Sequence, residues 1–173
     1  NDGYPDLFVT NDAHPNFLYH NQKDGTFREV ALLWGVAYNS QGTAQANMGV
    51  AVGDVGGDGW MDLFVTTFSD EYYPFFRNSG GGRFDEISTQ LGLATITLPY
   101  LGWATFFLDF DNDGALDLFI ANGHIFPQVE PSHETYRQQD FLLRGSGDFG
   151  FTHVTDQVGL SQVPVRSSRG GAY

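Results

Sequence analysis

The chain has 173 residues and a formal net charge of −13, which arises from 21 acidic and 8 basic residues. Because no basic stripe is present to meet phosphates, this charge argues against a nucleic-acid-binding protein. The sequence contains no cysteine, which excludes disulfides and thiolate metal sites within it. No apolar run approaches the roughly 20 residues of a membrane-spanning helix.

Short strands separated by turns are predicted along the whole chain. The apolar and aromatic runs are brief, Gly, Asn and Asp cluster between them, and no segment has a long helical period. In chain order, strands are predicted at 6–9, 17–20, 27–30, 48–53, 62–65, 74–77, 84–87, 104–108, 117–120, 141–144 and 151–154.

Three sequence patterns recur in constant order, which indicates a tandem repeat. An Asp-Leu-Phe run begins at Asp6, Asp62 and Asp117, at spacings of 56 and then 55 residues. The other two patterns are the ends of the third strands, at 19–21, 76–78 and 143–145, and a Gly-Phe pattern that begins at residues 25, 82 and 150. Four short strands in each unit describe a β-propeller blade. We therefore expect an all-β fold of four-stranded antiparallel blades, with repeat units of approximately 1–53, 54–108 and 109–173.

The clearest functional motif is the segment 109–117, called here the third loop. Carboxylates stand at its positions 1, 3, 5 and 9, and Gly114 at position 6 permits a sharp turn; the four carboxylates are Asp109, Asp111, Asp113 and Asp117. Calcium binds about 6–8 oxygen ligands, and alternating Asp side chains can supply many of them. An EF-hand is excluded because Ile120 stands where its acidic twelfth residue would be and because a strand follows. The alternative is an acidic turn without an ion, in which the clustered carboxylates would repel one another.

Two further segments have the same frame. The second loop, residues 54–62, retains Asp54, Asp58 and Asp62, but position 3 is Gly56, so we expect a weaker site. The first loop contains only the second half of the frame, with Asp2 and Asp6. Nine of the chain's Asp residues fall in the three loops, so much of its acidity is explained as a set of metal ligands.

These patterns resemble the FG-GAP/VCBS repeat of integrin-α-like β-propellers, and most closely the ASPIC/UnbV (cartilage acidic protein-like) group. The motifs that carry the resemblance lie at 53–65, at 108–124 and at 167–173. The resemblance implies Ca2+ as the bound ion. It also implies that backbone carbonyls of position 7 complete the ligand sets, and these belong to Tyr4, Trp60 and Ala115.

The same resemblance implies a ring of about seven blades, because propellers run to 4–8 blades. The chain begins inside a loop frame, and by the repeat another Gly-Asp should follow Tyr173. We therefore expect it to be part of a longer polypeptide, whose further blades, or partner subunits, pack against its two ends.

The sequence favours a noncatalytic module for binding, adhesion or assembly. The five histidines lack metal-binding spacing, and carboxylates engaged by calcium are poor acids and bases. Calcium affinity of the extracellular type, with Kd of about 10⁻⁴–10⁻³ M, suits an extracellular, cell-surface or periplasmic location. The alternatives are a lectin-like glycan binder and a propeller that supports an attached enzyme.

A protein or glycan partner is expected on the face opposite the calcium loops. An insertion at 122–139 lengthens the connection between the second and third strands of the third repeat, and it carries Phe126, Pro127, Glu130, Pro131, His133, Tyr136 and Arg137. Other connections expected on that face add Trp34, Tyr38, Tyr73 and Tyr100. Loops on a rigid scaffold are common binding sites.

Overall fold

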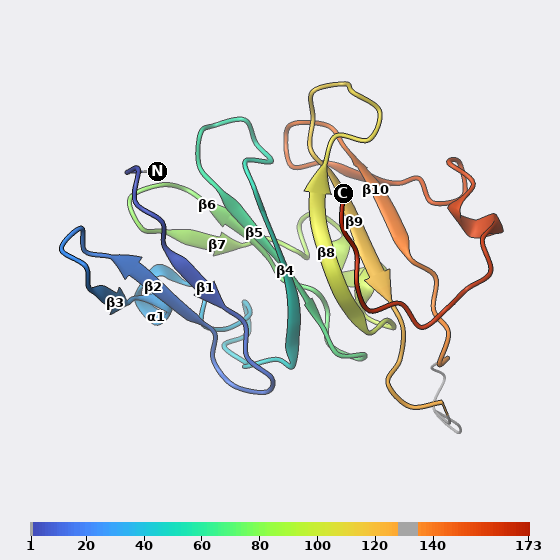
Figure 1. Ribbon diagram of the computed structural model, residues 1–173, viewed down its shortest axis with the longest axis horizontal. Helices are drawn as coiled ribbons and strands as arrows, with labels where there is room; N and C mark the ends of the chain where they lie inside the picture. The colour runs from blue at the N-terminus through green and yellow to red at the C-terminus, as the bar shows by residue number, and fades with distance from the viewer. Residues whose placement is uncertain (1, 128–134) are drawn as a thin grey trace.

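The computed structural model describes residues 2–127 and 135–173, and its eleven strands form three antiparallel sheets (Figure 1). The first sheet contains β1 (Leu7–Val9), β2 (Phe17–Asn21) and β3 (Phe27–Glu29). The second sheet contains β4 (Asn47–Gly53), β5 (Asp62–Thr67), β6 (Phe75–Asn78) and β7 (Phe84–Glu86). The third sheet contains β8 (Gly102–Leu108), β9 (Asp117–Asn122), β10 (Phe141–Gly145) and β11 (Phe151–His153).

Each sheet is a meander in which neighbours in sequence are neighbours in the sheet. The predicted all-β fold with four-stranded antiparallel units is therefore confirmed, and the sheets stand face to face as propeller blades without closing into a ring (Figure 1). β1 corresponds to β5 and β9, so the first sheet holds the second to fourth strands of the repeat.

Short helices lie in the connections that follow the outer strands. They are α1 (Ala31–Trp34), α2 (Leu93–Thr97) and the 3-10 helix η1 (Leu160–Gln162). Sequence reasoning did not predict them, because one helical turn leaves no period to detect. None of the helices in the described part of the chain is long and apolar enough to cross a membrane.

The strand register fixes the ends of the predicted calcium loops. Gly53 pairs with Asp62, and Leu108 pairs with Asp117, so each loop closes a hairpin between the first two strands of its sheet. Both hairpins have the same register irregularity, between Asn47 and Val50 and between Gly102 and Thr105. In Figure 1 both loops lie at the top, whereas the segment that leaves β9 extends from the opposite end.

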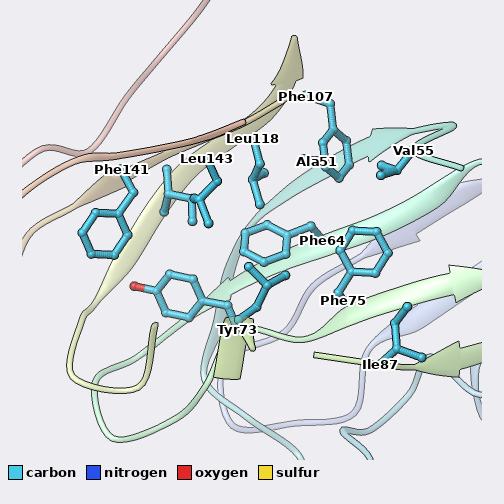
Figure 2. Packing of buried hydrophobic residues seen from close by; sticks show 12 residues of the cluster. Ala51, Val55, Phe64, Tyr73, Phe75, Ile87, Phe107, Leu118, Phe141 and Leu143 are labelled. Atoms are coloured by element: carbon cyan, nitrogen blue, oxygen red, sulfur yellow. The ribbon is translucent and has the colours of Figure 1, made fainter. Parts of the chain in front are cut away.

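The hydrophobic core lies between the sheets. Successive side chains of β5 alternate in direction, so Phe64 faces the third sheet while Leu63 and Val65 face the first. Figure 2 shows the boundary between the second and third sheets, where rings of the second sheet meet apolar side chains of the third; the residues are Phe64, Tyr73, Phe75, Leu118, Phe141 and Leu143. Full burial of such a side chain stabilises the fold by about 1.5–3 kcal/mol, so this packing fixes the sheets against one another.

The first strands of neighbouring sheets approach closely. A Cβ atom on Gly49 of β4 would lie 2.0 Å from the carbonyl oxygen of Trp103 in β8. The hydroxyls of Thr10 and Thr66, which stand at equivalent positions, donate to the carbonyls of Met48 and Trp103 at 2.8 and 2.7 Å. One hydrogen bond of the same kind therefore joins each pair of neighbouring sheets.

Candidate metal centres

The second and third loops have the same internal hydrogen bonds. In the third loop, the carboxylate of Asp109 accepts from the N–H groups of Asp113 and Gly114, both at 3.0 Å. In the second loop, Asp54 accepts from the N–H groups of Asp58 and Gly59 at 3.0 and 2.8 Å. The position-1 carboxylate is therefore turned inward across its loop, and the glycine at position 6 has a positive φ in both cases (87° and 88°).

The position-9 carboxylate connects each loop to the third strand of its sheet. Asp117 accepts from the N–H of Phe110 within the loop and from the N–H of Gly145 in β10, both at 2.8 Å. The equivalent Asp62 accepts from Val55 at 3.0 Å and from Asn78 at 2.8 Å. Asp62 and Asp117 are fully buried.

Burial raises the pKa of both Asp62 and Asp117, because it disfavours the ionised form, and it outweighs the hydrogen bonds that lower the pKa. Neighbouring carboxylates of the same loop raise the pKa further; Asp58 and Asp54 act on Asp62, and Asp111 and Asp113 act on Asp117. A bound cation would compensate this excess negative charge.

Three carboxylates converge in the third loop. Oxygens of Asp109, Asp111 and Asp117 all lie within 4.8 Å of one another, which is close enough to share one ion. Hard oxygen donors of this kind match the ligands that calcium takes, so this donor set fits the ion that the sequence implies. The carboxylate of Asp113 accepts from the N–H of Ala115 at 2.8 Å and is not one of the three.

The other two loops differ. Within residues 2–127 and 135–173, neither of them brings three carboxylates together in this way. In the second loop, Gly56 supplies no side chain, and a Cβ atom at this position would lie 2.5 Å from the ring of Phe149. In the first loop, the Asp2 carboxylate forms an ion pair with Lys23 at 3.0 Å, and Asp6 accepts from the N–H of Asn21 at 2.8 Å. The hydrogen bond from Lys23 lowers the pKa of Asp2.

An arginine beside the third loop was missed by sequence reasoning. The Nε of Arg144 lies 2.8 Å from Oδ2 of Asp111, and its guanidinium lies over the ring of Phe110 at 5.4 Å. This ion pair engages one of the two carboxylate oxygens of Asp111. The repeat offered a signal, because Arg77 and Arg144 stand at the same position of the third strands.

Four aromatic residues expected on a binding face are buried or half-buried against the core. Tyr73 is fully buried, and its hydroxyl donates to Oδ1 of Asn122 at 3.0 Å, so its predicted exposure is wrong. The Tyr100 ring packs edge-on against Phe141 at 4.5 Å. Tyr38 and Trp34 pack against the core between the first and second sheets. Glu130, Pro131 and His133 of the insertion lie outside the described residues.

Comparisons with known proteins agree with the repeat pattern. A family model described as an FG-GAP-like repeat matches residues 1–65 and 57–120. Cartilage acidic protein 1 of Xenopus tropicalis is 32% identical over 124 residues, which are 70% of this chain and 18% of that protein. The Homo sapiens protein of the same name is 32% identical over 119 residues, which are 68% of this chain and 17% of the relative. The matched region thus spans less than a fifth of these relatives.

Proposed function

Because the chain belongs to the FG-GAP-like repeat family, we propose that it is part of a calcium-binding, extracellular β-propeller that acts as a noncatalytic module for binding, adhesion or assembly. The observation that carries the proposal is the convergence of the Asp109, Asp111 and Asp117 oxygens in the third loop. The similarity to cartilage acidic protein 1 supports an extracellular setting.

In this proposal the third loop holds Ca2+ through Asp109, Asp111, Asp113 and Asp117, with the Ala115 carbonyl. The ion would neutralise the clustered charge and join the end of β8 to the start of β9. The second loop would bind more weakly through Asp54, Asp58, Asp62 and the Trp60 carbonyl. The first loop would contribute Asp2, the Tyr4 carbonyl and Asp6 to its site.

The role of calcium is structural in this proposal. The position-1 and position-9 carboxylates already accept backbone N–H groups, so they are fixed as acceptors rather than free to transfer protons. The three repeat units, approximately 1–53, 54–108 and 109–173, would be consecutive parts of a ring of about seven blades, since propellers run to 4–8. A partner would dock on the face opposite the loops.

Calcium binding is tested by titration calorimetry and by thermal melting of the intact protein. We expect calcium to raise the melting temperature above that in chelator, because an ion that binds only the native state stabilises it. Asp111→Asn should reduce this gain, since it removes a charged ligand without touching a backbone hydrogen bond of the loop. Asp156→Asn, an exposed change of the same charge outside the loops, is the matched control. Identical melting with millimolar calcium and with chelator would disprove the proposal.

Glycan binding is a second candidate, favoured by a cleft of about 790 Å³ between the first and second sheets. The cleft is lined by aromatic side chains that could stack on sugar rings, Tyr4, Trp34 and Trp60. It is also lined by the carboxylates of Asp2 and Asp6, which could accept hydrogen bonds from sugar hydroxyl groups. A glycan array on the full-length protein tests this candidate. Signals that Trp60→Ala removes would support it, and an array without signals would reject it.

A further inference from the structure

The hairpin that ends the third sheet departs from the repeat at Phe149. One hydrogen bond aligns the three hairpins: Gln22 donates to Thr26 in the first sheet, Ser79 to Arg83 in the second and Ser146 to Gly150 in the third. The residue before the acceptor is Gly25, Gly82 and Phe149, and its φ is 88°, 76° and 67°. A phenylalanine therefore adopts a left-handed backbone conformation at a position where the other sheets have glycine. Such a conformation disfavours a side chain and persists only where the surroundings hold it.

The surroundings that hold Phe149 belong to the second sheet. Its ring packs edge-on against Phe75, with centroids 6.1 Å apart, and the guanidinium of Arg77 lies over it at 4.6 Å. The ring also covers position 3 of the second loop, because a Cβ on Gly56 would lie 2.5 Å from its Cζ and 2.6 Å from its Cε2. No side chain fits at Gly56 while the ring of Phe149 stays in place.

The third loop has a different arrangement at the same place. Its position 3 is Asp111, which pairs with Arg144 at 2.8 Å, whereas Arg77, the counterpart of Arg144, stacks on the ring of Phe149. The two loops otherwise share their hydrogen bonds. The arginine is thus retained in both sheets, and its partner changes from a carboxylate to a ring.

We propose that Phe149 keeps the second loop a weak calcium site, because its ring occupies the space that a position-3 carboxylate would need and so restricts that position to glycine. This inference rests on the calcium function proposed above and adds a cause for the difference between the loops. A residue of the third sheet thus limits which ligands a site in the second sheet can have, so the two repeat units are not independent.

The boundary between the first and second sheets is packed in the reciprocal way. There the ring comes from Trp34, and a Cβ on Gly82 would lie 2.5 Å from its Cε2. The residue equivalent to Trp34 is Leu91, since the N–H groups of both donate to the residue four positions earlier, Val30 and Ile87. At each boundary a glycine of the second sheet is thus covered by a large ring, which comes from the connection after the outer strand at one boundary and from the hairpin at the other. Leu91 is smaller than Trp34, and at the boundary between the second and third sheets the ring of Phe149 supplies the additional volume.

Five variants of the full-length protein test the proposal. Phe149→Gly removes the ring and restores the residue type of the other hairpins. Gly56→Ala adds a Cβ without a ligand, and Gly56→Asp adds a Cβ with a ligand; both are made with and without Phe149→Gly. In chelator, Gly56→Ala should lower the melting temperature when Phe149 is present and have little effect when it is Gly. This comparison measures the steric conflict without any metal.

Metal binding at the second loop is followed by the luminescence of terbium, a calcium substitute, sensitised by Trp60 at position 7 of that loop and displaced by calcium. We expect Gly56→Asp with Phe149→Gly to bind about tenfold more tightly than Phe149→Gly alone, because added ligand charge raises calcium affinity. Gly56→Ala with Phe149→Gly should show no gain.

Two results would overturn the inference directly. One is an equal loss of melting temperature from Gly56→Ala in both backgrounds, and the other is Gly56→Asp binding as tightly with Phe149 as without it. A failure of the calcium function itself looks different, because the steric coupling in chelator would remain while neither loop of any variant bound terbium or calcium. That result would remove the affinity role of Phe149 together with the calcium function.

Discussion

The hydroxyl of Thr66 connects three strands by joining Gly49 to Trp103. It accepts from the N–H of Gly49 in its own sheet at 2.9 Å and donates to the carbonyl of Trp103 in the next sheet at 2.7 Å. Both partners lie where two sheets approach closely, because Gly49 has no room for a Cβ beside Trp103. One fully buried hydroxyl thus satisfies a donor and an acceptor at this contact.

We expect Thr66→Val to lower the free energy of unfolding by about 1–3 kcal/mol, because a buried N–H and a buried carbonyl both lose their partner. Urea unfolding followed by circular dichroism measures this loss. The control is Thr152→Val, at an exposed position in β11, which should stay within about 0.5 kcal/mol of the wild type. Equal unfolding midpoints for the two variants would contradict the role of Thr66.

Tyr73→Phe should cost about 1–2 kcal/mol of stability. The variant keeps the buried ring but removes the hydroxyl that donates to Oδ1 of Asn122, itself fully buried. Burial raises the pKa of the Tyr73 phenol well above its usual value, so the hydroxyl remains a donor at all ordinary pH values. Chemical unfolding of Tyr73→Phe beside Tyr173→Phe, whose ring is exposed, measures the effect. A loss of the same size in both variants would contradict the prediction.

The effect of Asp117→Asn on the melting temperature should depend on whether calcium is present. The raised pKa of Asp117 means that the ionised form is disfavoured in the native state, so its cost is absent below the ordinary pKa and is present at neutral pH. In chelator at neutral pH, the uncharged variant avoids this cost but turns its Nδ2 toward one of the two N–H groups that Asp117 accepts, so its melting temperature should differ little from that of the wild type. With calcium the wild type should melt higher, because the ion needs the charge. Scanning calorimetry under both conditions measures the difference between the variant and the wild type, and an equal difference in chelator and in calcium would contradict the prediction.

The stabilising contribution of Glu86 should disappear in acid. Burial of Glu86 opposes its ionised form, but hydrogen bonds from Ser88, Ser40 and Tyr72 outweigh it and lower its pKa. A lowered pKa means that the ionised group stabilises the fold above the ordinary pKa of glutamate and that this is lost as the pH falls through the lowered pKa. Glu86→Gln should therefore be less stable than the wild type by about 1–2 kcal/mol at neutral pH and equal to it in strong acid.

Glu71 provides a control for the experiment on Glu86, because its contribution to stability should change with pH in the opposite direction. Burial raises the pKa of Glu71, although its carboxylate accepts from the N–H of Ala46 at 2.8 Å. The stability that the wild type gains from protonating Glu71 is present in acid and lost as the pH rises through the raised pKa. Melting of both Gln variants from neutral to acidic pH measures the two trends. Parallel pH dependence in the two variants would contradict the assignment.

The repeat was predictable from sequence because backbone demands and side-chain chemistry coincide at the same residues. Asp62 and Asp117 each end a loop and begin a strand, and the structure starts β5 and β9 at these residues. The glycines at position 6 adopt the positive φ that the turn requires. Local patterns of this kind can be recognised in one sequence, and they also predicted the first residues of β5 and β9.

Relations between sheets were not predictable in the same way. Tyr73 stands in a connection, and an aromatic residue there fits a binding surface as well as it fits a core. Only the packing of the third sheet over the second decides that it is buried. Phe149 did carry a signal, because the third repeat lacks glycine before its hairpin acceptor. The consequence of that change depends on the contact with Gly56, which is distant in sequence. A contact between two distant residues cannot be recognised from a single sequence.

The reciprocal packing of Trp34 with Gly82 and of Leu91 with Phe149 limits how this architecture can be recombined. A chimera that duplicated the second unit next to itself would place Leu91 against Gly82, so neither the connection nor the hairpin would contribute a large ring there. One that set the third unit after the first would bring Trp34 against Phe149, with two rings competing for the same volume. Crossovers that keep these two pairs together must therefore fall inside a unit, between the hairpin and the connection that follows the outer strand. A unit that carries Phe149 must in addition follow a loop with glycine at position 3, because its ring fills that space. The exchangeable module of this fold is offset from its sheets by part of a repeat.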